Sequence, residues 1–279
     1  MAPSPDRRLT PATERVALRG AGVARDVITD GERRRVAMPL VDLCRAPAGL
    51  RDRQLLFGAD VLLIEARDGW GFVQAAADGY CGWVPLAALG DAGDVITHRV
   101  SAPATHVYPA PDFKQRETLS LSLGSRLVVT GVEGRFARLA GGGFLPLQHL
   151  SDQPGDAAEI AVSLLGTPYL WGGNSRWGID CSGLAQAALH GAGIACPGDS
   201  DLQRAAFPET ATIRRGDLLF WPGHVALALD ATTMIHATAF AMAVITEPIP
   251  DAIARIEAAG EGPFLGARRP RLDDRISFP

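Results

Sequence analysis

The chain has 279 residues, of which 47% are hydrophobic, and a formal net charge of −4 at pH 7. This length gives room for two or three domains with cores of their own. Because the chain lacks the basic surplus that neutralises a phosphate backbone, we expect no nucleic-acid partner. No apolar run reaches the about 18 residues of a membrane-spanning helix, so we expect no membrane partner.

Two features point to a cytoplasmic protein. The first nine residues contain no apolar stretch behind a positive start, so they do not have the pattern of a secretory signal. The four cysteines form no CxxC pair and suit a reducing compartment better than a disulfide framework. These cysteines are Cys44, Cys81, Cys181 and Cys196. We therefore expect the protein to be cytoplasmic.

The N-terminal half is expected to be an arm followed by two β-domains. Residues 1–34 are polar and Arg-rich, and they predict an extended arm or a short helix around Pro11–Leu18. Residues 35–93 and 94–153 repeat one order of short β-like runs separated by Gly and Pro, and each closes on a Pro-Leu pair. This order resembles bacterial SH3 domains and predicts two small SH3-like β-barrels. One larger β-domain is the alternative.

Residues 154–279 predict an α+β domain. An apolar helix is expected over 157–165, a second from Cys181 to about Gly191, and a short one near 201–206. Strands then follow in an antiparallel meander, at 218–221, 224–229, 234–239 and 244–246.

Cys181 is the candidate nucleophile. It follows Asp180, a good N-cap residue, so it lies in the first turn of its helix. The helix N-terminus is expected to favour the thiolate, and free N–H groups there can stabilise an oxyanion. The alternative is a buried cysteine with a packing role only.

His224 and His236 are the candidate partners of Cys181. If residues 230–232 form a three-residue hairpin loop, Leu229 pairs with Thr233, and His236 lies diagonal to His224 on the same sheet face. We expect that face to meet the Cys181 helix, with His224 as the base and His236 orienting its ring. A zinc site made of Cys181, His224 and His236 is the alternative.

Together these segments resemble a known family. In order and approximate spacing the chain is similar to the NlpC/P60 cysteine peptidases over about residues 154–270, through five motifs: Tyr169–Gly173, Asp180–Gly183, Arg215–Leu218, Gly223–Val225 and Ile235–Ala237. The resemblance implies a papain-like α+β fold with Cys181 as nucleophile, His224 as base and His236 as the third polar residue. It implies no metal and no organic cofactor. With the barrels in front, the chain resembles the γ-D-glutamyl-L-diamino acid peptidases of the dipeptidyl-peptidase VI type.

The resemblance also implies a site for the free α-amine of a substrate. Asp180, Ser182 and Ser200 would contribute from the catalytic domain, and Tyr80 from the first barrel. Trp171 is expected to contact substrate, with simple packing as its alternative. An acidic residue usually follows the barrel's Phe57-Gly58 pair, but Ala59 stands there, so we expect Asp60 or Glu65 to substitute.

The expected function is hydrolysis of the γ-D-Glu–L-diamino acid bond in murein-derived peptides with a free N-terminal L-Ala, as a step of cell-wall peptide recycling. Two alternatives stay open. The first is a thiol amidase or endopeptidase that acts on intact peptidoglycan. The second is a non-catalytic protein whose SH3-like barrels bind peptide.

Overall fold

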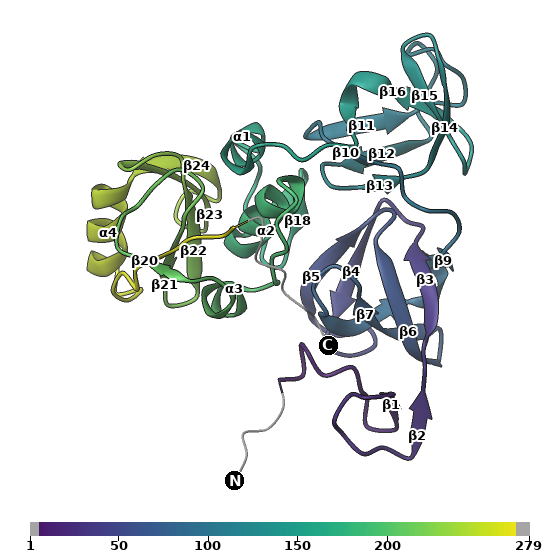
Figure 1. The fold of residues 1–279 in the computed structure, drawn as a ribbon, viewed down its shortest axis with the longest axis horizontal. Helices are drawn as coiled ribbons and strands as arrows, with labels where there is room; N and C mark the ends of the chain where they lie inside the picture. The colour runs from purple at the N-terminus through teal and green to yellow at the C-terminus, as the bar shows by residue number, and fades with distance from the viewer. Residues whose placement is uncertain (1–5, 272–279) are drawn as a thin grey trace.

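The computed structural model describes residues 6–271, and in it a short N-terminal segment and two β-units lie beside a mixed α/β part (Figure 1). In the N-terminal segment the predicted alternative of a helix at Pro11–Leu18 is wrong. The side chain of Thr13 accepts hydrogen bonds from two following N–H groups, and this local turn replaces the first turn of a helix. A parallel strand pair follows, made of β1 (Val16–Leu18) and β2 (Val27–Thr29).

The first β-unit is a seven-stranded sheet in the order β5-β4-β8-β7-β6-β3-β9. Its inner side chains, among them Val36, Leu43, Val73 and Val84, are almost fully buried in one cluster. Its strands are β3 (Glu32–Val36), β4 (Leu40–Cys44), β5 (Arg51–Leu56), β6 (Asp60–Arg67), β7 (Trp70–Ala75), β8 (Cys81–Pro85) and β9 (Leu89–Asp91), with a 3-10 turn, η1 (Leu86–Ala88), before β9.

The second β-unit has three small sheets around a hydrophobic cluster of its own, which includes Val100, Leu121 and Leu145. It joins the first unit at Gly58, whose φ is +77° and where a Cβ atom would overlap the carbonyl oxygen of Arg126. Its elements are β10 (His98–Val100), β11 (Ala104–Val107), β12 (Leu119–Ser122), β13 (Arg126–Leu127), β14 (Val129–Glu133), β15 (Phe136–Leu139), β16 (Phe144–Pro146), η2 (Leu147–His149) and β17 (Leu150–Ser151).

The α/β part is built on a six-stranded sheet in the order β20-β25-β21-β22-β23-β24. The predicted helices and meander are confirmed, but α4 was not predicted, although Pro250 in its first turn is typical of a helix start. The elements are α1 (Ala157–Ser163), β18 (Asn174–Ser175), β19 (Gly178–Ile179), α2 (Cys181–Gly191), α3 (Ser200–Ala206), β20 (Glu209–Thr210), β21 (Leu218–Trp221), β22 (His224–Ala228), β23 (Thr233–Thr238), β24 (Ala243–Pro248), α4 (Ile249–Ala258) and β25 (Ala267–Arg268).

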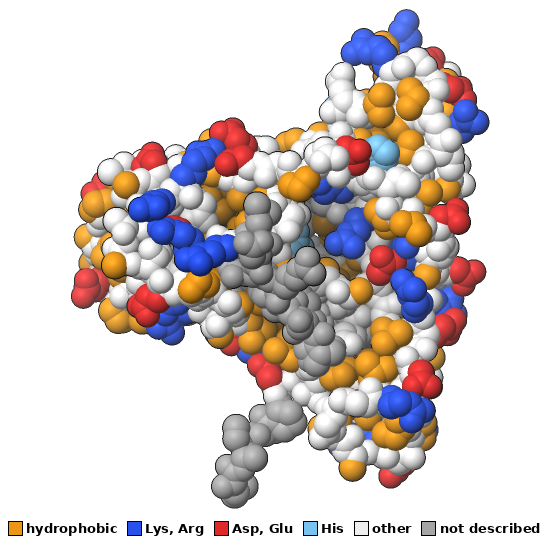
Figure 2. Space-filling view, in the orientation of Figure 1, with side chains coloured by type: hydrophobic (Ala, Val, Ile, Leu, Met, Phe, Trp, Pro, Cys, Tyr) orange, Lys and Arg blue, Asp and Glu red, His pale blue; other side chains and the backbone are white. Residues whose placement is uncertain are grey.

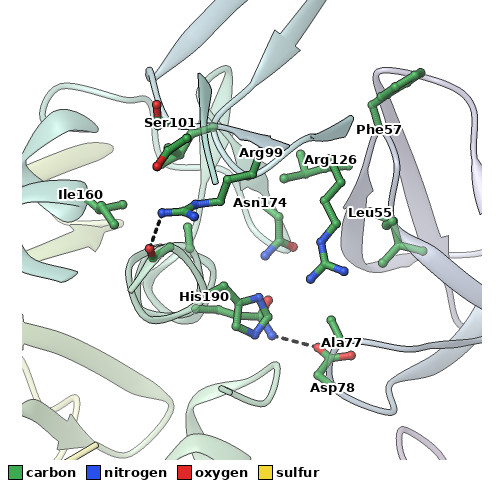
Figure 3. A pocket seen from close by; sticks show the side chains of 18 of the residues that line it. Leu55, Phe57, Ala77, Asp78, Arg99, Ser101, Arg126, Ile160, Asn174 and His190 are labelled. Carbon is green, nitrogen blue, oxygen red and sulfur yellow. Dashed lines mark hydrogen bonds between the residues drawn. The ribbon is translucent and has the colours of Figure 1, made fainter. Parts of the chain in front are cut away.

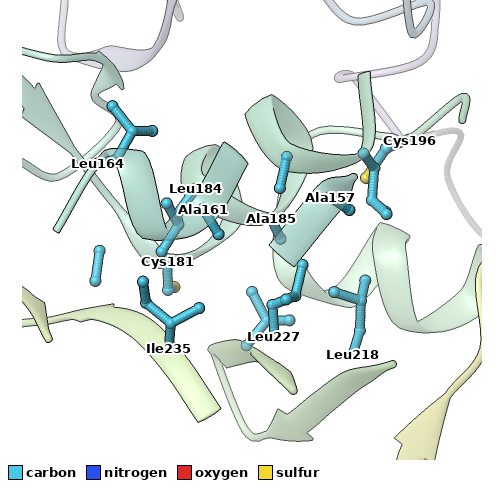
Figure 4. Packing of buried hydrophobic residues seen from close by; sticks show 14 of the residues in the cluster. Ala157, Ala161, Leu164, Cys181, Leu184, Ala185, Cys196, Leu218, Leu227 and Ile235 are labelled. Atoms are coloured by element: carbon cyan, nitrogen blue, oxygen red, sulfur yellow. The ribbon is translucent and has the colours of Figure 1, made fainter. Parts of the chain in front are cut away.

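Helices cover both faces of this sheet. On one face, α1 and α2 pack through small and branched side chains such as Leu184 and Ala185 against Leu227 and Ile235 (Figure 4). On the other face, α4 packs its buried side chains, Ile249 among them, against Leu219, Ala226 and Met234. The central strands are therefore buried on both sides, which fixes the register of the hairpin that carries His224 and His236. None of the helices within residues 6–271 is long and apolar enough to cross a membrane.

Candidate active site

Cys181 begins α2 because Asp180 caps the helix. Asp180 has an extended backbone, and its Oδ1 accepts the N–H of Gly183 at 2.7 Å and the hydroxyl of Ser182 at 3.0 Å. Its Oδ2 accepts the N–H of Gly172 at 2.8 Å, which ties the preceding loop to the helix start. Both carboxylate oxygens of Asp180 are thus used to hold the backbone on either side of Cys181.

The expectation of a resting thiolate at Cys181 is wrong. Burial, with a smaller contribution from the Asp180 carboxylate, raises the pKa of the Cys181 thiol to about 12. Backbone N–H groups of Val225, Ser182 and Cys181 act in the opposite direction but do not outweigh the burial. The cysteine is therefore a neutral thiol in the free protein and needs a base to become a nucleophile.

The predicted register of the β22–β23 hairpin is confirmed. Leu227 pairs with Ile235, and the N–H of Leu229 donates to Thr233 across the loop. Beyond Leu227, back toward His224, β22 is no longer paired with β23. β23 itself stays paired with β24 as far as Thr238. The Val225 N–H, free of that ladder, interacts with the Cys181 thiol instead. The nucleophile is therefore next to the strand that begins at His224.

The two imidazoles meet, as the register predicts. His224 Nε2 lies 2.9 Å from His236 Nδ1, a hydrogen-bond distance that leaves no room for a metal ion between these two nitrogens. Among residues 6–271, no three His, Cys, Asp or Glu side chains gather as a metal site requires. The alternative of a zinc site at Cys181, His224 and His236 therefore does not fit this geometry.

The expectation that these imidazoles lie on the face covered by α2 is wrong. Side chains alternate along a strand, and Val225, Leu227 and Ile235 provide the apolar surface on which α2 packs. The histidines therefore point toward the α4 side, where the ring of His224 lies 5.7 Å from that of Trp221. His224 is the first residue of β22 and precedes Val225, whose N–H interacts with the Cys181 thiol. We therefore expect the His224 ring to meet the thiol at the edge of the hairpin rather than across its face.

A carboxylate that the sequence analysis missed completes this chain of side chains. His236 Nε2 lies 3.3 Å from Glu247 Oε2 on β24, although not aligned as a hydrogen bond, and Glu247 is held by Arg255 of α4 at 2.8 Å. A proton on His236 Nε2 faces that carboxylate, so His236 Nδ1 accepts from His224 Nε2. His224 Nδ1, which has no hydrogen-bond partner in the described part of the chain, is then left with a lone pair for the thiol proton. Only the fold brings Glu247 and Arg255 beside His236.

Burial also keeps both imidazoles neutral. It lowers the pKa of His224 to about 3 and that of His236 to about 4, while the Glu247 carboxylate acts to raise both. The resting site is thus a neutral thiol beside a neutral base. Proton transfer from Cys181 to His224 then belongs to the reaction step itself.

Replacing Glu247 by glutamine should lower the kcat/KM plateau by about 10-fold to 100-fold. This is less than the about 10⁴-fold lost when the directly orienting carboxylate of a Ser-His-Asp triad is neutralised, because Glu247 acts through His236. Neutral His224 is the active form, and Glu247 raises the pKa of both rings, so the acid-side fall in activity should move to lower pH. A pH profile of kcat/KM measures both effects. Glu133→Gln, in a surface pair with Arg138, is the matched control, and an unchanged Glu247→Gln profile would contradict this role.

Tyr80 and Asp180–Ser182 approach each other across the junction between the first β-unit and the α/β part. The buried Tyr80 ring belongs to the β-unit core, while its hydroxyl donates to Asp199 Oδ2 at 3.0 Å. Asp199 and Ser182 line one small hollow with Asp180 and Asp52. Tyr80 therefore packs in the β-unit core and places its hydroxyl on Asp199, a residue that lines the hollow. Its contribution to amine binding stays a prediction.

Asp199 is the acidic residue that the sequence analysis missed. Its φ of +60° is unusual for a residue other than glycine, and such strain is concentrated at functional sites. Arg8 and Tyr80 both bind Oδ2 of Asp199, at 2.8 and 3.0 Å, so Oδ1 has no hydrogen-bond partner among residues 6–271. One carboxylate oxygen is thus held in place and the other is free to accept.

The residues expected to replace the acid at Ala59 lie elsewhere. Asp60 pairs with Arg35 at 2.8 Å, and Glu65 lies 3.9 Å from both Arg15 and Arg67. Neither lines the hollow, whereas Asp52 does. The expectation for Asp60 and Glu65 is therefore wrong, because both carboxylates, on β6, are turned toward arginines that lie outside this hollow.

Two further predicted residues border the site without a contact that defines their role. The side chain of Trp171 is 68% exposed, so it is free to contact a substrate. Its carbonyl accepts from Arg51 of the first β-unit at 3.2 Å. Ser200 begins α3 and lines a separate hollow with Trp221 and Gly223, beside the start of β22. Both roles remain predictions.

Comparisons with known proteins agree with this geometry. Residues 166–254 match the NlpC/P60 family, and residues 43–89 match the bacterial dipeptidyl-peptidase Sh3 domain. The chain is 31% identical to Dipeptidyl-peptidase 6 of Lysinibacillus sphaericus, over 66% of this chain and 79% of that protein. It is 27% identical to the Gamma-D-glutamyl-L-lysine dipeptidyl-peptidase of Bacillus subtilis (strain 168), over 66% and 71%.

A peptidoglycan endopeptidase and a solved structure are also similar. Peptidoglycan endopeptidase RipB of Mycobacterium tuberculosis (strain CDC 1551 / Oshkosh) is 36% identical, over 38% of this chain and 48% of that protein. The crystal structure of an NlpC/P60 family protein from Bacillus cereus ATCC 10987 superposes with a TM-score of 0.73, covering 85% of this chain and 99% of that one at 22% identity. That likeness concerns the fold.

A thiol at a helix start beside an imidazole pair, on a sheet covered by helices, defines a class of thiol-and-imidazole hydrolytic sites. This site and the similarity to the relatives above show that the chain belongs to the NlpC/P60 family of peptidases and carries an SH3 domain of the bacterial dipeptidyl-peptidase type.

Proposed function

We propose that the protein is a cysteine peptidase that hydrolyses the γ-D-Glu–L-diamino acid bond of murein-derived peptides with a free N-terminal L-Ala. The observation that carries this proposal is the Asp199 carboxylate beside the Cys181 helix start. It is held by Tyr80 of the first β-unit and has one free oxygen. A cationic α-amine needs such a charged acceptor in a confined hollow. A role in peptide recycling in the cytoplasm, and a second SH3-like barrel at residues 94–153, belong to the same proposal.

The chemistry follows from the arrangement of neutral groups. His224 Nδ1 takes the proton of Cys181 as the sulfur attacks the γ-carbonyl carbon, and His236 holds the His224 ring in the required tautomer. The backbone N–H of Cys181 stabilises the oxyanion. The C–N bond then breaks, and the leaving amine takes the proton from His224. Water, deprotonated by His224, hydrolyses the thioester and restores the thiol, so the cycle balances without a cofactor.

Acetylating the substrate amine should remove most of the activity. We expect kcat/KM for N-acetyl-L-Ala-γ-D-Glu-meso-diaminopimelate to fall at least about 10³-fold below that for the free-amine tripeptide, since a buried acceptor would be left unpaired. Product release measured by chromatography tests this. Asp199→Asn should raise KM for the free-amine peptide and change little for the acetylated one. Asp26→Asn, at an exposed position, is the matched control.

An endopeptidase acting on intact peptidoglycan is the second candidate, favoured by the similarity of the catalytic part to RipB. Equal cleavage of acetylated and free peptides would support it and contradict amine recognition. No turnover of either peptide by folded protein would contradict both and favour a thiol amidase or a non-catalytic peptide-binding protein.

A further inference from the structure

A second cavity lies away from Cys181, where the two β-units meet the helices of the α/β part. Its volume is about 440 Å³, within the usual range for small-molecule sites. Leu55 and Phe57 line it from the first β-unit, Leu123 from the second, and Ile160 from α1 (Figure 3). The walls are therefore largely apolar, and each part of the chain provides one of them.

The charged groups in this cavity do not balance. Of its carboxylates, Asp78 is bound by Arg53 and by Gln186 Nε2, and Asp60 pairs with Arg35. In the described part of the chain, Arg99 donates only through Nη2, to the backbone carbonyls of Gln153 and Gly191, both at 2.7 Å. These neutral acceptors do not cancel its charge.

Arg126 is the clearest unmatched group. Its guanidinium points into the cavity (Figure 3), and its side chain has no hydrogen bond or ion pair within residues 6–271. The hollow carries basic side chains in the space-filling view (Figure 2). Burial, with help from the Arg53 and Arg126 charges, lowers the pKa of the neighbouring His190 to about 4, so this imidazole stays neutral. Within residues 6–271 neither Arg99 nor Arg126 forms an ion pair, although the Asp152 carboxylate acts on Arg99 through space. The cavity thus holds two guanidinium groups that no ion pair neutralises.

We propose that this cavity binds a small organic anion, in which a carboxylate or phosphate group contacts Arg126 and Arg99 and an apolar body lies against Phe57 and Ile160. Guanidinium groups bind both kinds of anion through paired hydrogen bonds. The cavity borders α2 at Gln186 and His190, and it shares Arg53, Asn174 and Gln186 with the hollow beside Asp180 and Asp199. Arg99 and Arg126 do not line that hollow. The anion site therefore adjoins the proposed amine site without being part of it, and it does not depend on the proposed substrate.

Binding of simple probes tests the proposal. Isothermal titration with benzoate and with phenyl phosphate should show saturable binding of at least one of them, at one site per chain and at least about ten-fold tighter than neutral benzamide. Binding of benzoate alone would indicate a carboxylate ligand, and binding of phenyl phosphate alone a phosphate ligand. Saturable binding of neither anion would overturn the proposal.

Variants and a crystallographic measurement locate the site. Arg126→Gln should weaken binding at least about ten-fold, whereas Arg116→Gln, an exposed arginine of the same β-unit, should not. Unchanged binding by folded Arg126→Gln would overturn the proposal. In a crystal of the unaltered protein soaked with the para-bromo form of the bound probe, an anomalous peak should lie in this cavity. An anomalous peak elsewhere, with none in this cavity, would overturn the proposal.

Discussion

Cys181→Ala should abolish hydrolysis of L-Ala-γ-D-Glu-meso-diaminopimelate, with a loss of at least about 10⁴-fold in kcat, because no other group in the site can form the thioester. The fold should survive, since the change removes one sulfur atom at the edge of a core otherwise held by leucines and alanines. Product formation under steady-state conditions, with the melting temperature measured alongside, checks both statements.

Cys196→Ala is the matched control for Cys181→Ala. Cys196 is buried in the same hydrophobic cluster, but its thiol donates to the carbonyl of Pro197 and interacts with the Gln203 side chain, away from the imidazole pair. This variant should keep its activity and lose stability to a similar extent. Activity of Cys181→Ala within about a hundred-fold of the unaltered protein would contradict the assignment of the nucleophile.

His224→Ala should lower kcat/KM by about 10²-fold to 10⁴-fold, the usual contribution of a general base. The effect should be large because the Cys181 thiol, with its pKa raised to about 12, is protonated across the neutral range and cannot ionise without a base. For the unaltered protein, kcat/KM should stay level through neutral pH and fall only in acid, as His224 and His236 become protonated. A pH profile with His98→Gln as control tests this.

A different pH profile would contradict the neutral resting pair. If kcat/KM fell below pH 7 with the slope of one ionisation, an imidazole would titrate near its ordinary pKa, and burial would not dominate. A fall at alkaline pH would instead indicate a thiolate–imidazolium pair, which is lost when the imidazolium gives up its proton. In the His224→Ala variant, retention of more than a tenth of the activity would exclude His224 as the base.

Much of the site could be predicted from local pattern. Asp180 before Cys181 predicts the cap and the helix start because a short acceptor side chain satisfies free N–H groups there. The loop at 230–232 predicts the hairpin register, and with it the meeting of His224 and His236. These predictions succeeded because they depend on neighbours within a few residues or across one hairpin.

Other features could not be predicted because they depend on packing. Strand alternation determines that His224 and His236 share a face of the sheet. The sequence did not reveal that this face is the one covered by α4, which packs on Met234 and Ala226. The pKa of Cys181 follows from burial, a property of the assembled core, so it is raised although the residue lies at a helix start, where the sequence predicts a lowered pKa.

By itself the sequence determined the helix-start cysteine, its two histidines and the order of the β-units before them, since these follow from capping, turn chemistry and periodicity. Only the tertiary structure decided which charges surround them. It brought Glu247 and Arg255 behind His236, and Asp199 between Tyr80 and Arg8. The reason is physical. Ion pairs and hydrogen bonds depend on distance in space, and Tyr80 and Asp199, which lie 119 positions apart in the chain, meet only through folding.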